Sequence, residues 1–293
     1  MTQHAPHPAS LGHPSSNSPS YLPVAGGRIA YEIAGQGPLV VLAHGMGHSR
    51  DAYRFLTPRL LAAGYRVAAV DLRGCGESTA EWRSYTRTDI AGDLISLIRH
   101  IGGPATLVGH SISGGAATIA AAGAPELITG IVEIAPFTRA QAMQLSSFRS
   151  RTYRQGAYRM AGTMMGRVSQ WLRYLDHAYP GTKPADWNAR QAGIESRLRE
   201  PGRMKALQAM LKTSPADAGQ QLANVRCPAL IIEGSLDPDW IDPRAEGEAI
   251  IAALPAGAGE LVVIDGAGHY PHDQYPEETA TAILSFLREH AHA

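Results

Sequence analysis

The sequence lacks an excess of charge of either sign and lacks any long apolar run. Its 26 lysine and arginine residues are balanced by 26 aspartate and glutamate residues. Proteins dedicated to nucleic acid are normally basic, so we expect no nucleic-acid partner. No apolar stretch reaches the roughly 18 residues that a membrane span requires, so no membrane partner is expected either.

Cysteine is nearly absent as well. A disulfide between Cys75 and Cys227 stays open, but two cysteines do not indicate a disulfide framework. Residues 1–20 are rich in His, Pro and Ser, and they lack the basic and apolar segments of a secretory signal. We interpret them as a disordered tail and predict a cytoplasmic protein.

From residue 39 onward the chain alternates short apolar runs with longer amphipathic stretches. The runs show no alternation of polar and apolar residues, which is typical of strands buried on both faces of a parallel sheet. We expect strands at 39–42, 67–70, 105–108, 131–134, 229–232 and 261–264, and helices at 50–63, 86–101, 112–122, 243–254 and 276–290. The sequence therefore predicts an α/β fold with a mostly parallel central sheet flanked by helices.

Residues 137–215 interrupt this alternation of apolar runs and amphipathic stretches. The segment contains no clear buried strand and holds six of the eight methionines. Between residues 137 and 213 there are 14 basic and four acidic side chains, a net charge of +10. We predict a helical insertion between two strands, with residues 21–136 and 216–293 forming the core. The net positive charge has two interpretations. It belongs to an ordinary solvated helix surface, or it attracts an anionic substrate or partner.

The strongest local motif is Gly109-His-Ser-Ile-Ser-Gly-Gly115, which follows an expected strand and opens an expected helix. This context is that of a nucleophile elbow, a tight turn that needs small residues two positions before and after the serine. Gly109 fulfils the first requirement. Ser113 stands where the usual pattern has glycine, and it is still small. Ser111 is therefore the candidate nucleophile.

Two partners follow in the order that a catalytic triad of this type requires. Asp237 ends the turn Gly234-Ser-Leu-Asp237 after one expected strand, and His269 ends the loop Asp265-Gly-Ala-Gly-His269 after the next. Sites in open α/β sheets collect at the carboxyl ends of the strands, where both residues lie. The pair is therefore the candidate acid and base.

Together these motifs resemble the α/β-hydrolase family over residues 21 to 290. The resemblance includes His44-Gly-Met-Gly47, Asp71-Leu-Arg-Gly-Cys-Gly-Glu-Ser78 and Gly268-His-Tyr-Pro-His-Asp-Gln-Tyr-Pro276. It implies a serine hydrolase similar to esterases and lactonases, with residues 137–215 as its cap or lid. It also disfavours epoxide hydrolases and dehalogenases, whose nucleophile is aspartate.

The chemistry assigns a role to each candidate. Ser111 attacks after His269 removes its proton, and Asp237 orients the imidazole and stabilises its charged form. The backbone N–H groups of Met46 and Ile112 are the expected oxyanion donors. This scheme predicts hydrolysis of a carboxylic ester or lactone through an acyl-enzyme, without cofactor or metal. The oligomeric state is left open.

Alternatives stay open at this point. The same triad serves thioester hydrolysis, carbon–carbon bond hydrolysis, and lyase or cyclase chemistry without a cofactor. A non-catalytic small-molecule receptor with a retained triad is the alternative from another class.

Other polar residues near the motifs receive lesser roles. Asp239 follows Asp237 closely, but the resemblance places the acid three residues after Gly234, which is the position of Asp237. His272 could form a His-x-x-His pair with His269, yet no further cluster of metal ligands accompanies it, so we expect it in a loop or on the surface. Four residues are expected to line the substrate pocket: His44, His110, Met160 and Met164.

Overall fold

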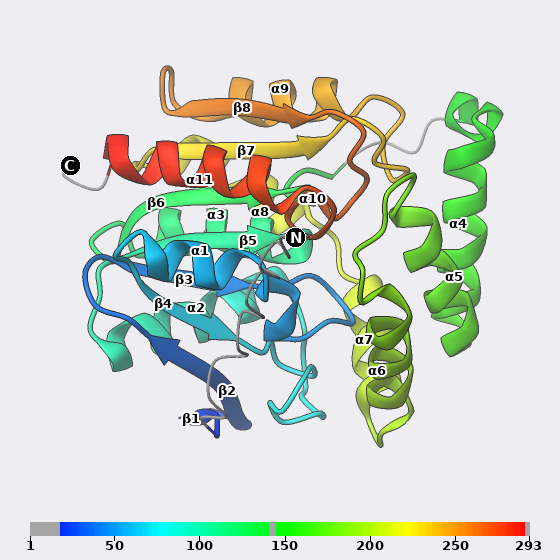
Figure 1. Ribbon diagram of the computed structural model, residues 1–293, viewed down its shortest axis with the longest axis horizontal. Coiled ribbons are helices and arrows are strands. Elements are labelled where there is room, and N and C mark those ends of the chain that lie inside the picture. Colours follow the sequence, from blue (N-terminus) through cyan, green and yellow to red (C-terminus); the bar gives the residue numbers. More distant parts are fainter. Residues whose placement is uncertain (1–17, 141–144, 291–293) are drawn as a thin grey trace, which may run out of the picture.

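The centre of the molecule is an eight-stranded sheet in the order β1-β2-β4-β3-β5-β6-β7-β8 (Figure 1). The computed structural model describes residues 18–140 and 145–290. β2 pairs antiparallel with β1 and β4, and every other neighbouring pair is parallel. The strands are β1 (Ser20–Val24), β2 (Gly27–Ala34), β3 (Leu39–Ala43), β4 (Arg66–Val70), β5 (Ala105–His110), β6 (Ile128–Ile134), β7 (Ala229–Gly234) and β8 (Gly259–Ile264).

Helices cover both faces of this sheet, because its apolar strands have to be shielded from water on both sides. In β3, Val41 belongs to the buried cluster that includes residues of α2, α3 and α9, whereas Leu42 belongs to the cluster that includes residues of α1 and α11. The helices are α1 (Leu56–Ala62), α2 (Arg87–Ile101), α3 (Ile112–Gly123), α4 (Arg151–Met164), α5 (Val168–Ala178), α6 (Trp187–Arg199), α7 (Arg203–Leu211), α8 (Ala216–Gly219), α9 (Pro243–Ala253), α10 (Pro271–Gln274) and α11 (Pro276–His290), with short 3-10 turns η1 (Arg50–Tyr53), η2 (Leu145–Arg149) and η3 (Leu222–Asn224).

All six expected strands are present, so the predicted fold class is confirmed. The edge hairpin of β1 and β2 was not predicted, because its strands mix buried and exposed residues without a clear period. β1 begins at Ser20, one residue inside the expected tail, and residues 1–17 lie outside the described part. The helix expected at 50–63 is divided into η1 and α1, since Pro58 has no N–H with which to continue a helix from Arg54.

The described residues between β6 and β7 form η2, η3 and the helices α4 to α8, and no strand. Helices α4 to α7 pack on one another at the end of the sheet toward which β7 and β8 point (Figure 1). Among the described residues, none of the helices is long and apolar enough to cross a membrane. The helical segment therefore stands over the edge of the sheet where the candidate site residues collect.

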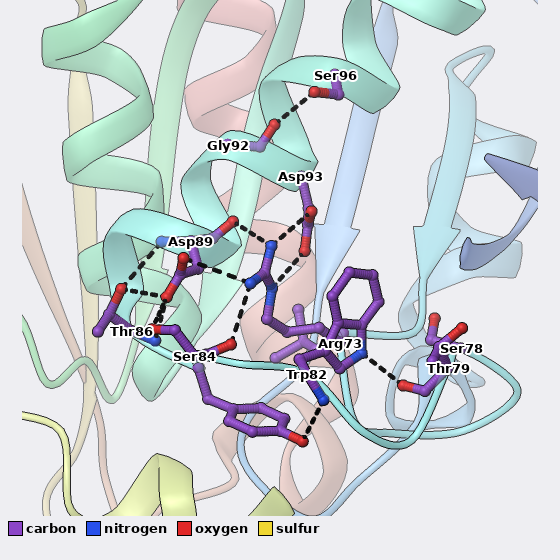
Figure 2. A network of polar contacts seen from close by, with 12 residues as sticks. Arg73, Ser78, Thr79, Trp82, Ser84, Thr86, Asp89, Gly92, Asp93 and Ser96 are labelled. Atoms are coloured by element: carbon purple, nitrogen blue, oxygen red, sulfur yellow. Dashed lines mark hydrogen bonds and ion pairs between the residues drawn. The ribbon is translucent and has the colours of Figure 1, made fainter. Parts of the chain in front are cut away.

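The long loop after β4 is held to α2 by Arg73 (Figure 2). The guanidinium donates to both carboxylate oxygens of Asp93, at 2.8 and 2.9 Å, and to the backbone oxygen of Ser84 at 3.0 Å. It also lies 4.7 Å from the centroid of the Trp82 ring. Both charged side chains are largely buried, at 11% and 9% exposure, so each depends on the other for compensation.

We expect Arg73→Met to lower the free energy of unfolding by about 3 kcal/mol, because it leaves the buried carboxylate of Asp93 without its partner. Arg99→Met is the matched control. Arg99 is 62% exposed and pairs with Glu126 at 3.6 Å, so its loss should change stability by less than about 0.5 kcal/mol. Urea denaturation of both variants measures the difference, and equal effects would contradict a buried ion pair.

Candidate active site

The turn between β5 and α3 holds Ser111 in a strained backbone conformation, with φ of 56° and ψ of −118°. Such a conformation typically costs a non-glycine residue about 1–3 kcal/mol. Gly109 must lack a side chain, because a Cβ there would lie 2.2 Å from the backbone oxygen of Ser113. The hydroxyl of Ser113, in the position where glycine is usual, donates to the backbone oxygen of His44 at 2.6 Å. This serine therefore ties the turn to the loop after β3.

The loops after β7 and β8 bring a carboxylate against an imidazole. Nδ1 of His269 lies 2.7 Å from Oδ2 of Asp237, and both side chains are buried. The other carboxylate oxygen of Asp237 accepts from the N–H of Asp239 at 2.9 Å. The two loops touch at Gly234, where a Cβ would lie 2.0 Å from the backbone oxygen of Gly268. The carboxylate and the imidazole are thus held against each other by their loops.

The surroundings of His269 favour its protonated form. Burial by itself would lower the pKa of His269, because an imidazolium is poorly solvated in the interior. The charge of Asp237, its hydrogen bond and the charge of Asp239 outweigh burial and raise the pKa of His269 above its ordinary value. A side chain that gains stability on protonation is suited to accept a proton.

Ser111 and His269 share two neighbours, His110 and Phe137. Nε2 of His110 lies 2.9 Å from the backbone oxygen of His269, and the two ring centroids are 5.0 Å apart. The N–H of Phe137 donates to the backbone oxygen of Ser111 at 3.2 Å, and its ring packs edge-on against His269. Ser111 therefore lies near the pair of Asp237 and His269, at the carboxyl ends of β5, β7 and β8.

The two expected oxyanion donors lie next to the serine. Ile112 is the first residue of α3, and the first N–H groups of a helix have no carbonyl partner within it. Gly45 precedes Met46 and packs on the serine, since a Cβ at Gly45 would lie 3.1 Å from Cβ of Ser111. The donor roles of Met46 and Ile112 stay predictions.

His44 and His110 lie buried beside the site, and their pocket roles stay predictions. Each has no exposed surface. Nε2 of His44 accepts from the N–H of Leu72 at 3.1 Å, and its Nδ1 lies 2.7 Å from the oxygen of Gly45. Burial lowers the pKa of His44 although Asp71 opposes the shift. A neutral ring with its proton on Nδ1 satisfies both contacts.

Comparison with known proteins agrees with this geometry. The sequence profile described as "Alpha/beta hydrolase family" matches residues 40–282. The chain belongs to the alpha/beta hydrolase family.

Relatives of this alpha/beta hydrolase cover most of its length. It is 28% identical over 277 residues to 2-(acetamidomethylene)succinate hydrolase of Mesorhizobium japonicum, across 89% of this chain and 92% of that protein. It is 25% identical over 314 residues to epoxide hydrolase A of Mycobacterium tuberculosis, across 85% of this chain and 90% of the relative. The bromoperoxidase of Bacillus anthracis has the same fold, with a TM-score of 0.74, 22% identity and coverage of 92% of this chain and all of the other.

In this alpha/beta hydrolase, the end of helix α5 holds the loop that carries His269. The N–H of His269 donates to the backbone oxygen of Ala178 at 3.0 Å. A Cβ at Gly268 would lie 2.3 Å from the same oxygen, so this approach requires glycine. The side-chain amide of Gln274 accepts from the N–H of Gly268 and donates to the oxygen of Pro180, both at 2.8 Å. Apart from the glycines of the loop, nothing in the sequence signals these contacts.

The methionines after β6 are divided between interior and surface. Met160 packs against the buried cluster around Trp171, whereas Met164 is 42% exposed. Met210 belongs to the core of the sheet, and Met143 lies outside the described residues. The pocket roles of Met160 and Met164 stay predictions.

His272 is buried, so its expected place in a loop or on the surface is wrong. It lies in the short helix α10, and its ring centroid is 4.7 Å from that of His110 and 5.2 Å from that of Tyr53. Burial, with a smaller contribution from the charge of Arg54, lowers the pKa of His272 to about 3. The ring is therefore neutral and fills the interior beneath the site. The turn of α10 directs it inward, which a loop prediction does not capture.

The contacts of two further residues beside the site, Tyr270 and Arg190, were not predicted from the sequence. Tyr270 follows His269, stacks on Tyr179 and has its hydroxyl 3.1 Å from Nε2 of His48. The guanidinium of Arg190 in α6 lies 3.4 Å from the other ring nitrogen of His48. Burial first and the charge of Arg190 second hold the pKa of His48 well below its ordinary range. An arginine of α6 therefore reaches the loop that carries Met46.

The described residues contain two groups whose atoms are spaced as metal ligands could be. One consists of Asp237, Asp239 and His269, and the other of the surface residues Glu260, Glu289 and His290. In the first group, Nδ1 of His269 is already paired with Asp237. We interpret that group as an acid–base system and not as a cation site.

We expect His269→Ala to abolish turnover, and His272→Ala to keep most of the turnover but to lower stability. Removing the buried ring of His272 leaves a cavity, which should lower the free energy of unfolding by about 2–4 kcal/mol. Turnover of an ester and thermal unfolding are measured on both variants. A larger loss of turnover in His272→Ala than in His269→Ala would move the base to His272.

Proposed function

We propose that the protein is a serine hydrolase that cleaves a carboxylic ester or lactone through an acyl-enzyme on Ser111. One observation carries this proposal. Ser111 occupies a positive-φ turn beside a buried pair in which His269 Nδ1 lies 2.7 Å from the carboxylate of Asp237. This combination of strained serine, base and acid is what nucleophilic catalysis by serine requires.

The steps follow from the groups present. His269 removes the proton of Ser111 as the hydroxyl oxygen attacks the carbonyl carbon, and the imidazolium forms beside Asp237. The N–H groups of Met46 and Ile112 stabilise the oxyanion. When the tetrahedral intermediate collapses, His269 donates the proton to the leaving alcohol. Water then attacks the acyl-enzyme with His269 as base. As the acid is released, His269 returns this proton to the oxygen of Ser111. The sequence of steps needs no cofactor.

The relatives support hydrolysis in general and leave the bond open. The M. japonicum relative is named as a hydrolase of a substituted succinate, and the M. tuberculosis relative as an epoxide hydrolase. Epoxide hydrolases use an aspartate nucleophile, and Ser111 stands at that position here, which favours acyl transfer. Thioester or carbon–carbon bond hydrolysis, lyase or cyclase chemistry and a receptor with a retained triad are the competing proposals. A cytoplasmic location remains part of the proposal.

We also propose that residues 137–215 act as a cap that selects the substrate, and that this substrate is anionic. Most cap arginines do not support the second point. Arg197 and Arg199 are half or more exposed and pair with glutamates, and Arg151 and Arg154 are exposed. Arg190 differs, because its half-buried guanidinium contacts His48 and forms no ion pair within the described residues.

We expect Ser111→Ala to lower kcat/KM on the order of 10⁴-fold or more while the protein stays folded, because a triad acts as a unit. A panel of p-nitrophenyl esters and lactones, followed by product analysis, first identifies a substrate. A fluorophosphonate label that reacts with the wild type but not with Ser111→Ala tests for an activated serine. Retention of wild-type turnover by Ser111→Ala would exclude the mechanism. Labelling without turnover of any substrate would favour the receptor.

For the anionic substrate, we expect Arg190→Gln to raise KM about tenfold for an ester that carries a carboxylate, with a smaller effect on its neutral analogue. The difference should shrink as salt screens the charge. Arg199→Gln is the matched control, since Arg199 is 64% exposed and paired with Glu195. If each ester has the same KM with Arg190→Gln as with the wild type, Arg190 supports His48 and does not bind the substrate.

A further inference from the structure

A second carboxylate, that of Asp239, faces the imidazole of His269. Oδ2 of Asp239 lies 3.6 Å from Nδ1 of His269, compared with 2.7 Å for Oδ2 of Asp237. The side chain of Asp239 is 9% exposed. One buried ring nitrogen therefore has two carboxylates within 4 Å, although only one of them can accept its proton in a short hydrogen bond.

The position of Asp239 is fixed by a residue from the cap. The hydroxyl of Tyr174 in α5 donates to Oδ2 of Asp239 at 2.5 Å, so the oxygen nearest the imidazole is also the one that the tyrosine holds. Tyr174 is 1% exposed and stacks on Trp171, with 5.1 Å between ring centroids. Trp171 in turn packs on Gly47 of the loop after β3, where a Cβ would lie 2.8 Å from the indole. The tyrosine therefore has little freedom to release Asp239.

We propose that Asp239 is a positioning residue for the base, a second carboxylate that stabilises the imidazolium of His269 and is held in place by Tyr174 of the cap. The proposal rests on the function proposed above, in which His269 takes up a proton. It adds a residue that the spacing of the motif assigns no role.

The electrostatics follow from the charges that face the pair. Asp237 and Asp239 lie in the loop after β7. The neutral rings of His110 and His272 come from β5 and α10, and Tyr174 comes from α5. Burial first, and then the charge of Asp237, raise the pKa of Asp239 to about 6, although His269 and Tyr174 oppose the shift. Above that pH the carboxylate is largely ionised. It then raises the proton affinity of His269, whose own pKa is raised in part by Asp239.

The sign of the effect makes the proposal testable without turnover. Removing the charge of Asp239 removes attraction for the imidazolium, so the pKa of His269 should fall. We expect Asp239→Asn to lower it by about one unit, a tenfold change in proton affinity. An NMR titration of the His269 ring, assigned with His269→Gln, measures this directly. The acidic limb of kcat/KM should move to lower pH by the same amount.

Titration without substrate separates this inference from the proposed function. If no ester is turned over but the pKa of His269 falls in Asp239→Asn, the role proposed for Asp239 is supported and the proposed ester hydrolysis is contradicted. If Asp239→Asn folds and leaves the His269 pKa unchanged, the proposal is overturned. Asp239→Ala provides the same measurement where the asparagine variant does not fold.

The role of Tyr174 is tested by a double-mutant cycle. Tyr174→Phe keeps the stack on Trp171 and removes only the hydroxyl. If the tyrosine acts through Asp239, Tyr174→Phe should lower kcat about threefold with little change in KM, and should have no further effect in Asp239→Asn. Tyr179→Phe is the matched control, because it removes a buried tyrosine hydrogen bond to another carboxylate, that of Asp273, at 2.7 Å. Its effect should be the same in both backgrounds. Independent effects of Tyr174→Phe and Asp239→Asn would contradict the link.

Discussion

The strained backbone at Ser111 is the constraint on which the rest of the site depends. A serine at positive φ persists only where its surroundings determine its conformation. Here the N–H of Ser111 donates to Ile134 at the end of β6, and its carbonyl accepts from Phe137. Ser113 fastens the other side of the turn to the loop after β3. Because parallel strands end at the same edge of the sheet, the strand order itself supplies the groups that hold Ser111.

A second constraint is the placing of a positive charge in the interior. His269 is 2% exposed, and a buried imidazolium is stable only beside a negative charge. Asp237 provides that charge at hydrogen-bonding distance. The histidines around the pair have the opposite character, since burial lowers the pKa of His44, His48, His110 and His272. Within this group of rings, protonation is therefore directed to His269, the one that contacts a carboxylate.

Local pattern was sufficient to predict the strands β3 to β8 and to propose Ser111, Asp237 and His269, because each of the three follows the carboxyl end of a strand that contains an apolar run. Features that depend on contacts between distant segments were missed. Spacing alone set Asp239 aside, and nothing in the sequence places Tyr174, 65 residues earlier, against its carboxylate. His272 was expected in a loop or on the surface because no cluster of metal ligands accompanies it, but α10 turns it under Tyr53. The β1–β2 hairpin was not predicted because strands at the edge of a sheet need not be apolar throughout.

The contacts of α5 bear on how the proposed cap would act. A lid that only shapes a pocket would touch the substrate and leave the catalytic loops to the sheet. Here the last residue of α5, Ala178, accepts the backbone hydrogen bond of His269, and Tyr174 on the same helix binds Asp239. A displacement of α5 would therefore remove support from His269 at its backbone and alter the charge near its ring. If residues 137–215 act as the proposed cap and His269 as the proposed base, a substitution that moves α5 to admit a new substrate also alters His269, so substrate choice and catalytic rate change together.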